Sequence, residues 1–166
     1  NSSLRSIELL APKPGDRVLD ICAAPGGKTT AMAELMLDSG EIIASDIHEH
    51  RVKLIRDLSS RLELSCIDAI IMDASIYNED MKEKFDILTD PIEESYDYVI
   101  CINSLHNLPS KEMIYSFLNK AKSLVKPGGY LMYSTCTINK RENEQIVSRL
   151  CDTFENACIV EYNSIL

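Results

Sequence analysis

The stretch VLDICAAPGGKTT, residues 18–30, decides how the rest of the sequence is interpreted. It begins as a short apolar strand, turns through Pro25, Gly26 and Gly27, and ends in Gly-Lys-Thr, as phosphate-binding loops do. A phosphate loop of the GxxxxGK[ST] type needs a glycine five residues before the last one, and Cys22 occupies that position. Pro25 also removes a backbone N–H from a loop that would bind phosphate through such groups. The stretch therefore favours a turn without a strong phosphate clamp, and a phosphate-loop nucleotide hydrolase remains the alternative.

Strand and helix patterns alternate on both sides of this turn. Short apolar runs predict strands, with a sixth expected at the end of the chain, at 17–21, 41–46, 66–73, 96–102, 130–136 and 157–162. Helical spacing predicts helices at 28–37, at 52–62, from Pro109 to Val125 before a KPGG turn, and through Leu150 after a capping pair of Asn139 and Glu142. This alternation predicts an α/β domain, a mostly parallel sheet with helices on both faces.

Composition narrows the class of protein. A chain of 166 residues with 45% apolar residues can form one domain with its own core. No apolar run approaches the roughly 20 residues that a membrane span needs, and no signal-peptide pattern opens the chain. The six cysteines include no CxxC pair, which argues against a zinc site and a disulfide framework and favours an intracellular protein.

The net charge of −9 is concentrated in one acidic run between Glu79 and Asp97. Such a run is typical of a solvated loop. An acidic domain attracts nucleic acid poorly by itself.

Three predicted strands carry an aspartate at or near the carboxyl end, namely Asp20, Asp46 and Asp73. In parallel sheets ligands bind beyond that end. Asp46 follows Gly27 at the spacing of a carboxylate that binds a ribose diol, and Asp73 could accept a hydrogen bond from an adenine amino group. Together with the glycine turn they predict a site for an adenosine-type cofactor.

The same residues carry a family resemblance. DICAAPGGKTT resembles the cofactor-binding motif of the Nop/Sun (Fmu) family of RNA cytosine carbon-5 methyltransferases, which use S-adenosylmethionine on a Rossmann-like fold. ASDIHEHR resembles the second motif of that family, MDAS the third and YSTCTINKRENE the sixth. The resemblance covers nearly the whole chain and implies a Rossmann-like methyltransferase fold whose last strands are missing here.

The resemblance implies a set of cofactor-binding residues. The methionine part of S-adenosylmethionine is expected at the turn formed by Cys22, Ala23, Ala24, Pro25, Gly26, Gly27 and Lys28. Asp46, with Arg51 of the second motif, is expected at the ribose, and Asp73 at the adenine. No metal is implied.

In the sixth motif the Thr-Cys pair supplies the nucleophile, which here is Cys136. Carbon 5 of cytosine is a poor nucleophile until a thiolate adds at carbon 6 and makes the ring enamine-like. Loss of the carbon-5 proton and expulsion of the cysteine then restore the aromatic ring, so covalent catalysis splits one hard step into easier ones.

The fourth motif departs from the family pattern. The family has Asp-Ala-Pro-Cys after this strand, where this chain has Ile102, Asn103, Ser104 and Leu105. Asn103, Ser104 and His106 are the candidate substrate-binding residues, and Cys101 is expected in the core. Losing the acid could cost about a hundredfold in rate. Two readings follow, an atypical methyltransferase and a cofactor- or RNA-binding subunit that has lost catalysis.

We expect residues 1–166 to form a single methyltransferase catalytic domain, part of a longer protein with a separate basic RNA-binding domain. The expected substrate is transfer or ribosomal RNA. No membrane partner is expected.

Overall fold

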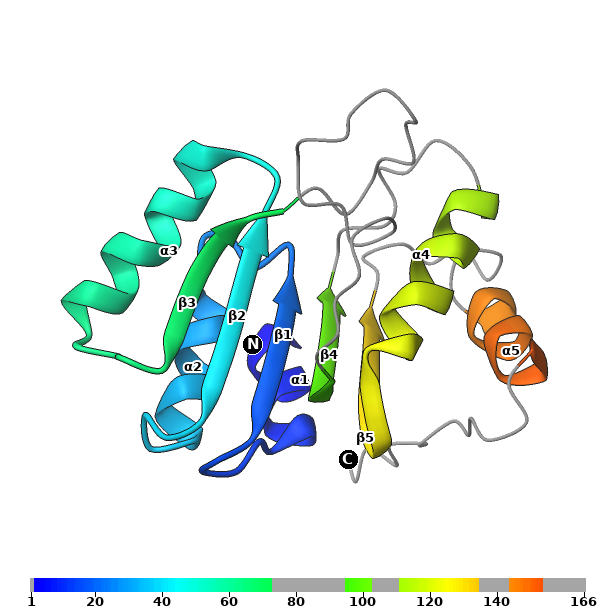
Figure 1. Ribbon diagram of the computed structural model, residues 1–166, viewed down its shortest axis with the longest axis horizontal. Helices are drawn as coiled ribbons and strands as arrows, with labels where there is room; N and C mark the ends of the chain where they lie inside the picture. Colours follow the sequence, from blue (N-terminus) through cyan, green and yellow to red (C-terminus); the bar gives the residue numbers. More distant parts are fainter. Residues whose placement is uncertain (1, 73–94, 103–110, 135–143, 154–166) are drawn as a thin grey trace.

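Five parallel strands form one twisted sheet at the centre of the molecule (Figure 1). The computed structural model describes residues 2–72, 95–102, 111–134 and 144–153. The strands are β1 (Arg17–Ile21), β2 (Glu41–Asp46), β3 (Ile67–Ile71), β4 (Tyr96–Ile102) and β5 (Val125–Ser134). Their order across the sheet is β3-β2-β1-β4-β5. The chain therefore adds β2 and β3 on one side of β1 and then crosses to the other side of β1 for β4 and β5. The predicted α/β class with a parallel sheet is confirmed.

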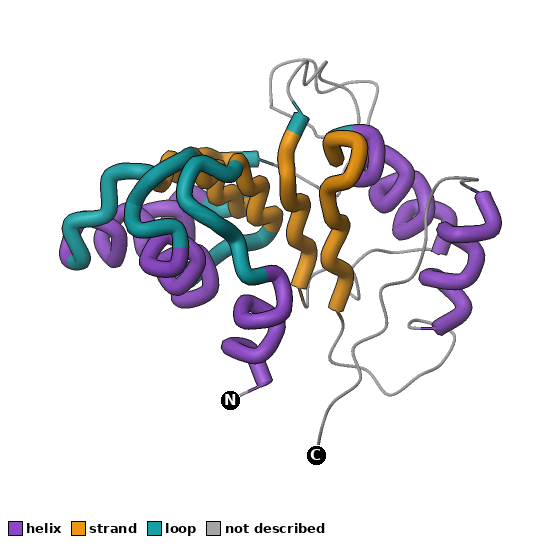
Figure 2. Tube along the Cα trace, turned by 90° about the horizontal axis from the view of Figure 1, so that it is seen from below, coloured by secondary structure: helices purple, strands orange, loops and turns teal. Residues whose placement is uncertain are grey.

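Helices cover both faces of the sheet (Figure 2). The helices are α1 (Ser2–Leu10), α2 (Gly27–Leu35), α3 (Glu49–Arg61), α4 (Lys111–Ser123) and α5 (Glu144–Thr153). Val18 packs with Ile7 of α1 and Met32 of α2, whereas its neighbour Leu19 packs with Phe117 of α4. Because successive strand residues point to opposite faces, α1 and α2 lie on one face and α4 on the other.

The helices and strands agree closely with the sequence patterns. The helix predicted at 28–37 is α2, that at 52–62 is α3, and the predicted strand 66–73 is β3, each with slightly different ends. Cys101 is fully buried in β4, as expected for a core residue. The capping pair and the predicted sixth strand lie outside the described residues, and no described helix is long and apolar enough to cross a membrane.

The prediction that Val125 ends a helix is wrong. The helix α4 ends at Ser123, and Val125 pairs with Tyr96 as the first residue of β5. The next pair is Tyr98 with Tyr130, so the KPGG sequence forms an irregularity inside the strand. Val125 is an apolar residue of the sheet. It also lies four residues after Ala121 of α4, so its spacing resembles that of the apolar stripe of the helix.

Candidate cofactor-binding site

The segment 22–26 crosses the carboxyl ends of β1 and β2. The Ala23 N–H donates to the Ser45 carbonyl oxygen at 2.7 Å, and the Gly26 N–H donates to the Ala23 carbonyl oxygen at 2.9 Å. The Ala24–Pro25 peptide bond is cis, and Cys22 has a positive φ of 66°. This segment, called the cofactor turn below, is thus hydrogen-bonded to the neighbouring strand and leads directly into α2.

Gly26 occupies a position that a larger residue would strain. Its φ is 104°, in the left-handed region, and it precedes the first residue of α2. A Cβ atom placed on it would lie 3.3 Å from the Ile55 Cα and 3.5 Å from a Leu58 methyl carbon. Gly26 therefore lets the beginning of α2 approach α3 closely.

A buried hydrogen bond joins β1 to the first turn of α2. The Thr29 hydroxyl donates to Asp20 Oδ2 at 2.7 Å, and Asp20 is 1% exposed. Burial raises the pKa of Asp20 to about 6, and the nearby Asp46 carboxylate also raises it, while the Thr29 hydrogen bond and Lys28 lower it. The end of β1 thus holds a carboxylate in a place that disfavours its charge.

Asp46 ends β2 beside this pair. It is 2% exposed, and its Oδ1 accepts a hydrogen bond from the His48 N–H at 3.4 Å. Its Oδ2 lies 3.5 Å from Arg51 Nη1, and Arg51 Nη2 donates to the Ala24 carbonyl oxygen at 3.4 Å. Arg51 therefore links α3, β2 and the cofactor turn.

The described residues fit a ligand that carries hydroxyl or amino groups. Asp20 Oδ1 and Asp46 Oδ2 are buried and accept no hydrogen bond from the described part of the chain, although Asp46 Oδ2 has the 3.5 Å ion pair with Arg51. Buried carboxylate oxygens are normally hydrogen-bonded, so such atoms at the binding edge of a parallel sheet indicate a site for donors from a ligand. Pro25 and Gly27 are exposed, which leaves one side of the turn open.

The structure brings together seven consecutive predicted residues, Cys22 to Lys28, with Asp46 and Arg51. The other predicted site residues lie outside the described residues: Asp73, Asn103, Ser104, His106 and Cys136. Among the described residues, no group of three His, Cys, Asp or Glu side chains could hold a metal ion.

Sequence reasoning assigned no role to Thr29 and treated Asp20 as one of three strand-end acids. A signal was present, because an acid at the end of a buried strand and a threonine in the first turn of the next helix are a plausible hydrogen-bonded pair across a tight turn. The buried pair of Asp20 and Thr29 lies beneath the predicted cofactor site and adds Thr29 to the residues that form it.

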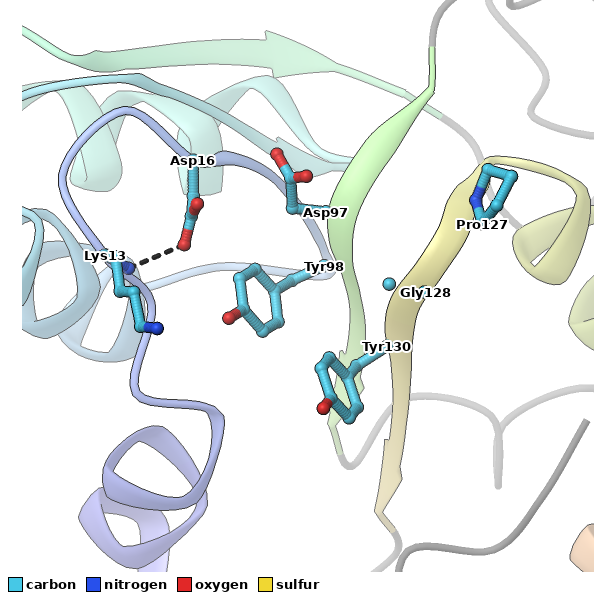
Figure 3. Close-up of a pocket in the computed structure, with 8 residues that line it drawn as sticks. Lys13, Asp16, Asp97, Tyr98, Pro127, Gly128 and Tyr130 are labelled. Atoms are coloured by element: carbon cyan, nitrogen blue, oxygen red, sulfur yellow. Dashed lines mark hydrogen bonds between the residues drawn. The ribbon is translucent and has the colours of Figure 1, made fainter.

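A hollow of about 200 Å³ lies at the opposite, amino-terminal edge of the sheet (Figure 3). The rings of Tyr98 and Tyr130 stack there with centroids 5.8 Å apart, and Lys13 and Asp16 lie beside them. It contains no predicted site residue. The two ends of the sheet therefore differ, and the buried carboxylates of Asp20 and Asp46 lie at the carboxyl-terminal ends of the strands, away from this hollow.

The sheet order, together with the comparisons that follow, places the chain in the class of S-adenosylmethionine-dependent methyltransferases with a Rossmann-like fold. The family model for 16S rRNA methyltransferase RsmB/F matches residues 7–92 and 104–164. The chain belongs to this RsmB/F (Nop/Sun) methyltransferase family.

Curated relatives agree with this assignment. The chain is 39% identical over 155 residues to a probable ribosomal RNA small subunit methyltransferase B of Bacillus subtilis, covering 88% of this chain and 35% of that protein. It is 38% identical over 169 residues to the mouse tRNA (cytosine(72)-C(5))-methyltransferase NSUN6, covering 88% of this chain and 34% of NSUN6. The chain thus spans about a third of the length of these relatives.

A solved structure supports the fold. The crystal structure of NSun6 from Pyrococcus horikoshii with SFG, an analogue of S-adenosylmethionine, superposes with a TM-score of 0.73 at 26% identity. The match covers 91% of this chain and 40% of that one.

Proposed function

We propose that this chain is the catalytic domain of an RNA methyltransferase that forms 5-methylcytosine in transfer or ribosomal RNA. The observation that carries the proposal is the pair of buried carboxylates, Asp20 and Asp46, beside the cofactor turn. Asp20 Oδ1 has no hydrogen-bond partner among the described residues, and Asp46 Oδ2 has only an ion pair with Arg51 at 3.5 Å. Membership of the family supplies the reaction type, and the names of the relatives point to cytosine carbon 5 in ribosomal or transfer RNA.

In this proposal the described residues hold S-adenosylmethionine. The cofactor turn lies against its methionine part, and Asp46 accepts hydrogen bonds from its ribose. Arg51 fixes the position of Asp46 relative to the Ala24 carbonyl through the two contacts described above. When bound, the cofactor supplies an electrophilic methyl group. Asp73, at the position after Met72, is proposed for the adenine.

Cys136 is the proposed nucleophile. The strand β5 ends at Ser134, two residues earlier in the sequence, and its carboxyl end lies on the same edge as those of β1 and β2 because the strands are parallel. The Cys136 thiolate forms a bond to carbon 6 of the cytosine, so that carbon 5 becomes nucleophilic. After methylation a base removes the carbon-5 proton, and the electron pair of that bond expels the thiolate. A thiol with an ordinary pKa of about 8.5 needs help to ionise at neutral pH.

A second candidate function rests on the fourth motif. The strand β4 ends at Ile102, where the family carries an acid, and Leu105 replaces the cysteine that assists product release. The matched ranges of the family model leave out residues 93–103, which contain Ile102. In this candidate the protein keeps cofactor or RNA binding and acts as a noncatalytic subunit. Asn103, Ser104 and His106 are the substrate-binding residues proposed in either case.

Covalent trapping separates the two candidates. The full-length protein and its Cys136→Ala variant are mixed with S-adenosylmethionine and RNA that contains 5-azacytosine. A denaturant-resistant adduct that disappears in Cys136→Ala supports the enzyme. Cofactor binding by calorimetry without any adduct from cellular RNA supports the binding subunit, and the absence of both contradicts the proposed function.

We also propose that most of the affinity for RNA comes from a basic domain outside this acidic chain. Phosphate contacts from lysine and arginine dominate such affinity, and this chain has a net charge of −9. Equal RNA affinities for the 166-residue chain and the full-length protein at the same salt concentration would contradict this.

A further inference from the structure

The strand β3 has an open side. It is the outermost strand of the described sheet and pairs with β2 on its inner side (Figure 1). The Cys66 carbonyl oxygen accepts a hydrogen bond from the Ile42 N–H at 2.8 Å, and the Met72 N–H donates to the Asp46 carbonyl oxygen at 3.1 Å. Backbone groups alternate in direction along a strand. The even-numbered residues of β3 therefore direct their N–H and C=O groups toward β2, and the odd-numbered residues direct theirs to the open side.

The open side has the features of a strand that can pair with another chain. Ile67, Ala69 and Ile71 direct their backbone groups to it, and the strand sequence IDAII is rich in isoleucine, which favours strands. Ile71 is 43% exposed, so an apolar side chain meets solvent at the end of the strand. Exposed backbone groups of this kind are a template for a further strand.

Arg56 of α3 covers the centre of this edge. Its Nε donates to the Ala69 carbonyl oxygen at 3.1 Å, and its Nη2 donates to the same oxygen at 2.6 Å. Ala69 is the middle residue of β3, so this oxygen is the central acceptor of the open side. A charged donor makes a stronger hydrogen bond than a neutral backbone N–H does. A strand that approached the edge would have to displace the guanidinium to reach Ala69.

We propose that the open edge of β3 is a surface for pairing with β3 of a second copy of this chain, and that Arg56 keeps this surface closed. This role of Arg56 is independent of the proposed function. It concerns the outer side of α3, whereas Arg51 of the same helix contacts the cofactor turn.

The sequence of β3 fits a second copy of itself. When two β3 strands meet antiparallel with Ala69 opposite Ala69, Ile67 lies opposite Ile71, and the outward backbone groups of all three residues find partners. Asp68 then lies opposite Ile70 of the second copy, so that like charges do not meet. This pairing is two-fold and self-complementary. The carbonyl oxygen that Arg56 occupies lies at its centre, and each copy blocks the other.

The test is sedimentation velocity of the full-length protein over a range of protein concentrations at one salt concentration. Arg56→Ala removes the donors and should strengthen self-association at least about tenfold. Lys53→Ala, three residues earlier on α3, removes the same charge from an exposed position and should leave self-association unchanged. Arg56→Lys keeps the charge without the two-pronged contact and should give an intermediate result. Thermal unfolding verifies that each variant folds, and Arg56→Lys decides if Arg56→Ala does not unfold cooperatively.

Two further measurements locate the contact. Amide hydrogen exchange at Ile67, Ala69 and Ile71 should slow in Arg56→Ala as its concentration rises, because the outward N–H groups become hydrogen-bonded. Adding Ile71→Lys places a charge at an exposed position on the edge. The double variant Arg56→Ala/Ile71→Lys should therefore associate no more strongly than the natural protein.

Stronger association of Arg56→Ala with slower exchange at the three amides, reversed by Ile71→Lys, would support this role of the edge and of Arg56. Three results would overturn it: association of Arg56→Ala no stronger than that of the natural protein, an equal gain in Lys53→Ala, or association while the three amides exchange as before. Slow exchange of these amides that depends on concentration in the natural protein would also overturn it, because the edge would then pair with Arg56 in place.

Discussion

Arg51 contacts two parts of the site at once, since its Nη1 lies 3.5 Å from Asp46 Oδ2 and its Nη2 donates to the Ala24 carbonyl oxygen. Its side chain is 42% exposed, whereas that of Asp46 is 1% exposed. The guanidinium is thus a bridge between a buried carboxylate and the cofactor turn, placed by the first turn of α3.

Replacing Arg51 should therefore affect binding more than stability. We expect Arg51→Gln to weaken S-adenosylmethionine about three- to tenfold, because Asp46 and the turn lose their common partner. The unfolding free energy should change by less than about 1 kcal/mol, because the Arg51 guanidinium is 42% exposed and its contact with the buried Asp46 is long, at 3.5 Å. Calorimetry and urea unfolding measure the two quantities. Arg61→Gln, at the other end of the same helix, is the matched control, and equal affinities for the two variants would contradict the bridging role.

Gly26, the last residue of the cofactor turn, and Gly27, the first residue of α2, should respond differently to replacement by alanine. Gly26 has a φ of 104° and lies against Ile55, so Gly26→Ala should cost about 1–3 kcal/mol of unfolding free energy. Gly27 is the first residue of α2, and no atom lies within 4 Å of a Cβ placed on it. Gly27→Ala should therefore be neutral or stabilising by up to about 1 kcal/mol. Chemical unfolding of both variants decides, and similar losses in both would refute this reading of the turn.

Asp20 should make stability fall as pH rises. Its pKa is raised from 3.8 to about 6, so the penalty for burying its charge is absent below pH 3.8 and complete above about pH 6. We expect the unfolding free energy of Asp20→Asn, relative to the natural protein, to be greater at pH 7.5 than at pH 4. The largest possible difference is about 3 kcal/mol. Parallel pH curves for the two proteins would show that Asp20 does not titrate as described.

Asp38 should act in the opposite sense. Its carboxylate accepts hydrogen bonds from the Ser65 and Cys66 N–H groups at 2.8 Å each and from the Ser65 hydroxyl, which join the α2–β2 turn to the start of β3. These bonds hold its pKa below the usual range, so its contribution is present above about pH 4 and lost as the solution becomes more acid.

Asp38→Asn should therefore destabilise the protein at pH 7 and differ less from it at pH 3. Asp57→Asn, on the exposed side of α3, is the control and should change little at either pH. Urea unfolding at both pH values tests this, and an equal effect of the two substitutions would contradict the role of Asp38.

The sequence predicted the sheet and the cofactor turn because their signals are local. Alternating apolar runs determine which segments become strands, and the motif of residues 22–28 is contiguous. Asp46 and Arg51 were identified through the second motif, and the structure places both beside the turn. The ends of the elements were less accurate, since Val125 satisfies helical spacing and strand pairing equally well and only its contact with Tyr96 distinguishes them.

The Asp20–Thr29 hydrogen bond was not predicted, because burial decides its meaning. The same two residues on an exposed turn would be an ordinary polar pair. In this fold both side chains are buried under the turn, which turns a strand-end acid into an energetically costly charge. The contact between Gly26 and α3 was likewise hidden, since it depends on how two helices pack.

The strand order has a consequence for how the chain is made. On one side of β1 the strands β1, β2 and β3 pair with neighbours that are near in the sequence. On its other side β1 pairs with β4, where Asp97 accepts a hydrogen bond from the backbone N–H of Arg17, 80 residues away in the sequence. Closing so long a loop is slower than closing a short one. During synthesis, the half that carries the cofactor turn thus emerges from the ribosome first, with one flank of β1 still unpaired. An unpaired strand flank is where nascent chains associate with one another, so we expect this interval to be the one in which the protein depends most on chaperones.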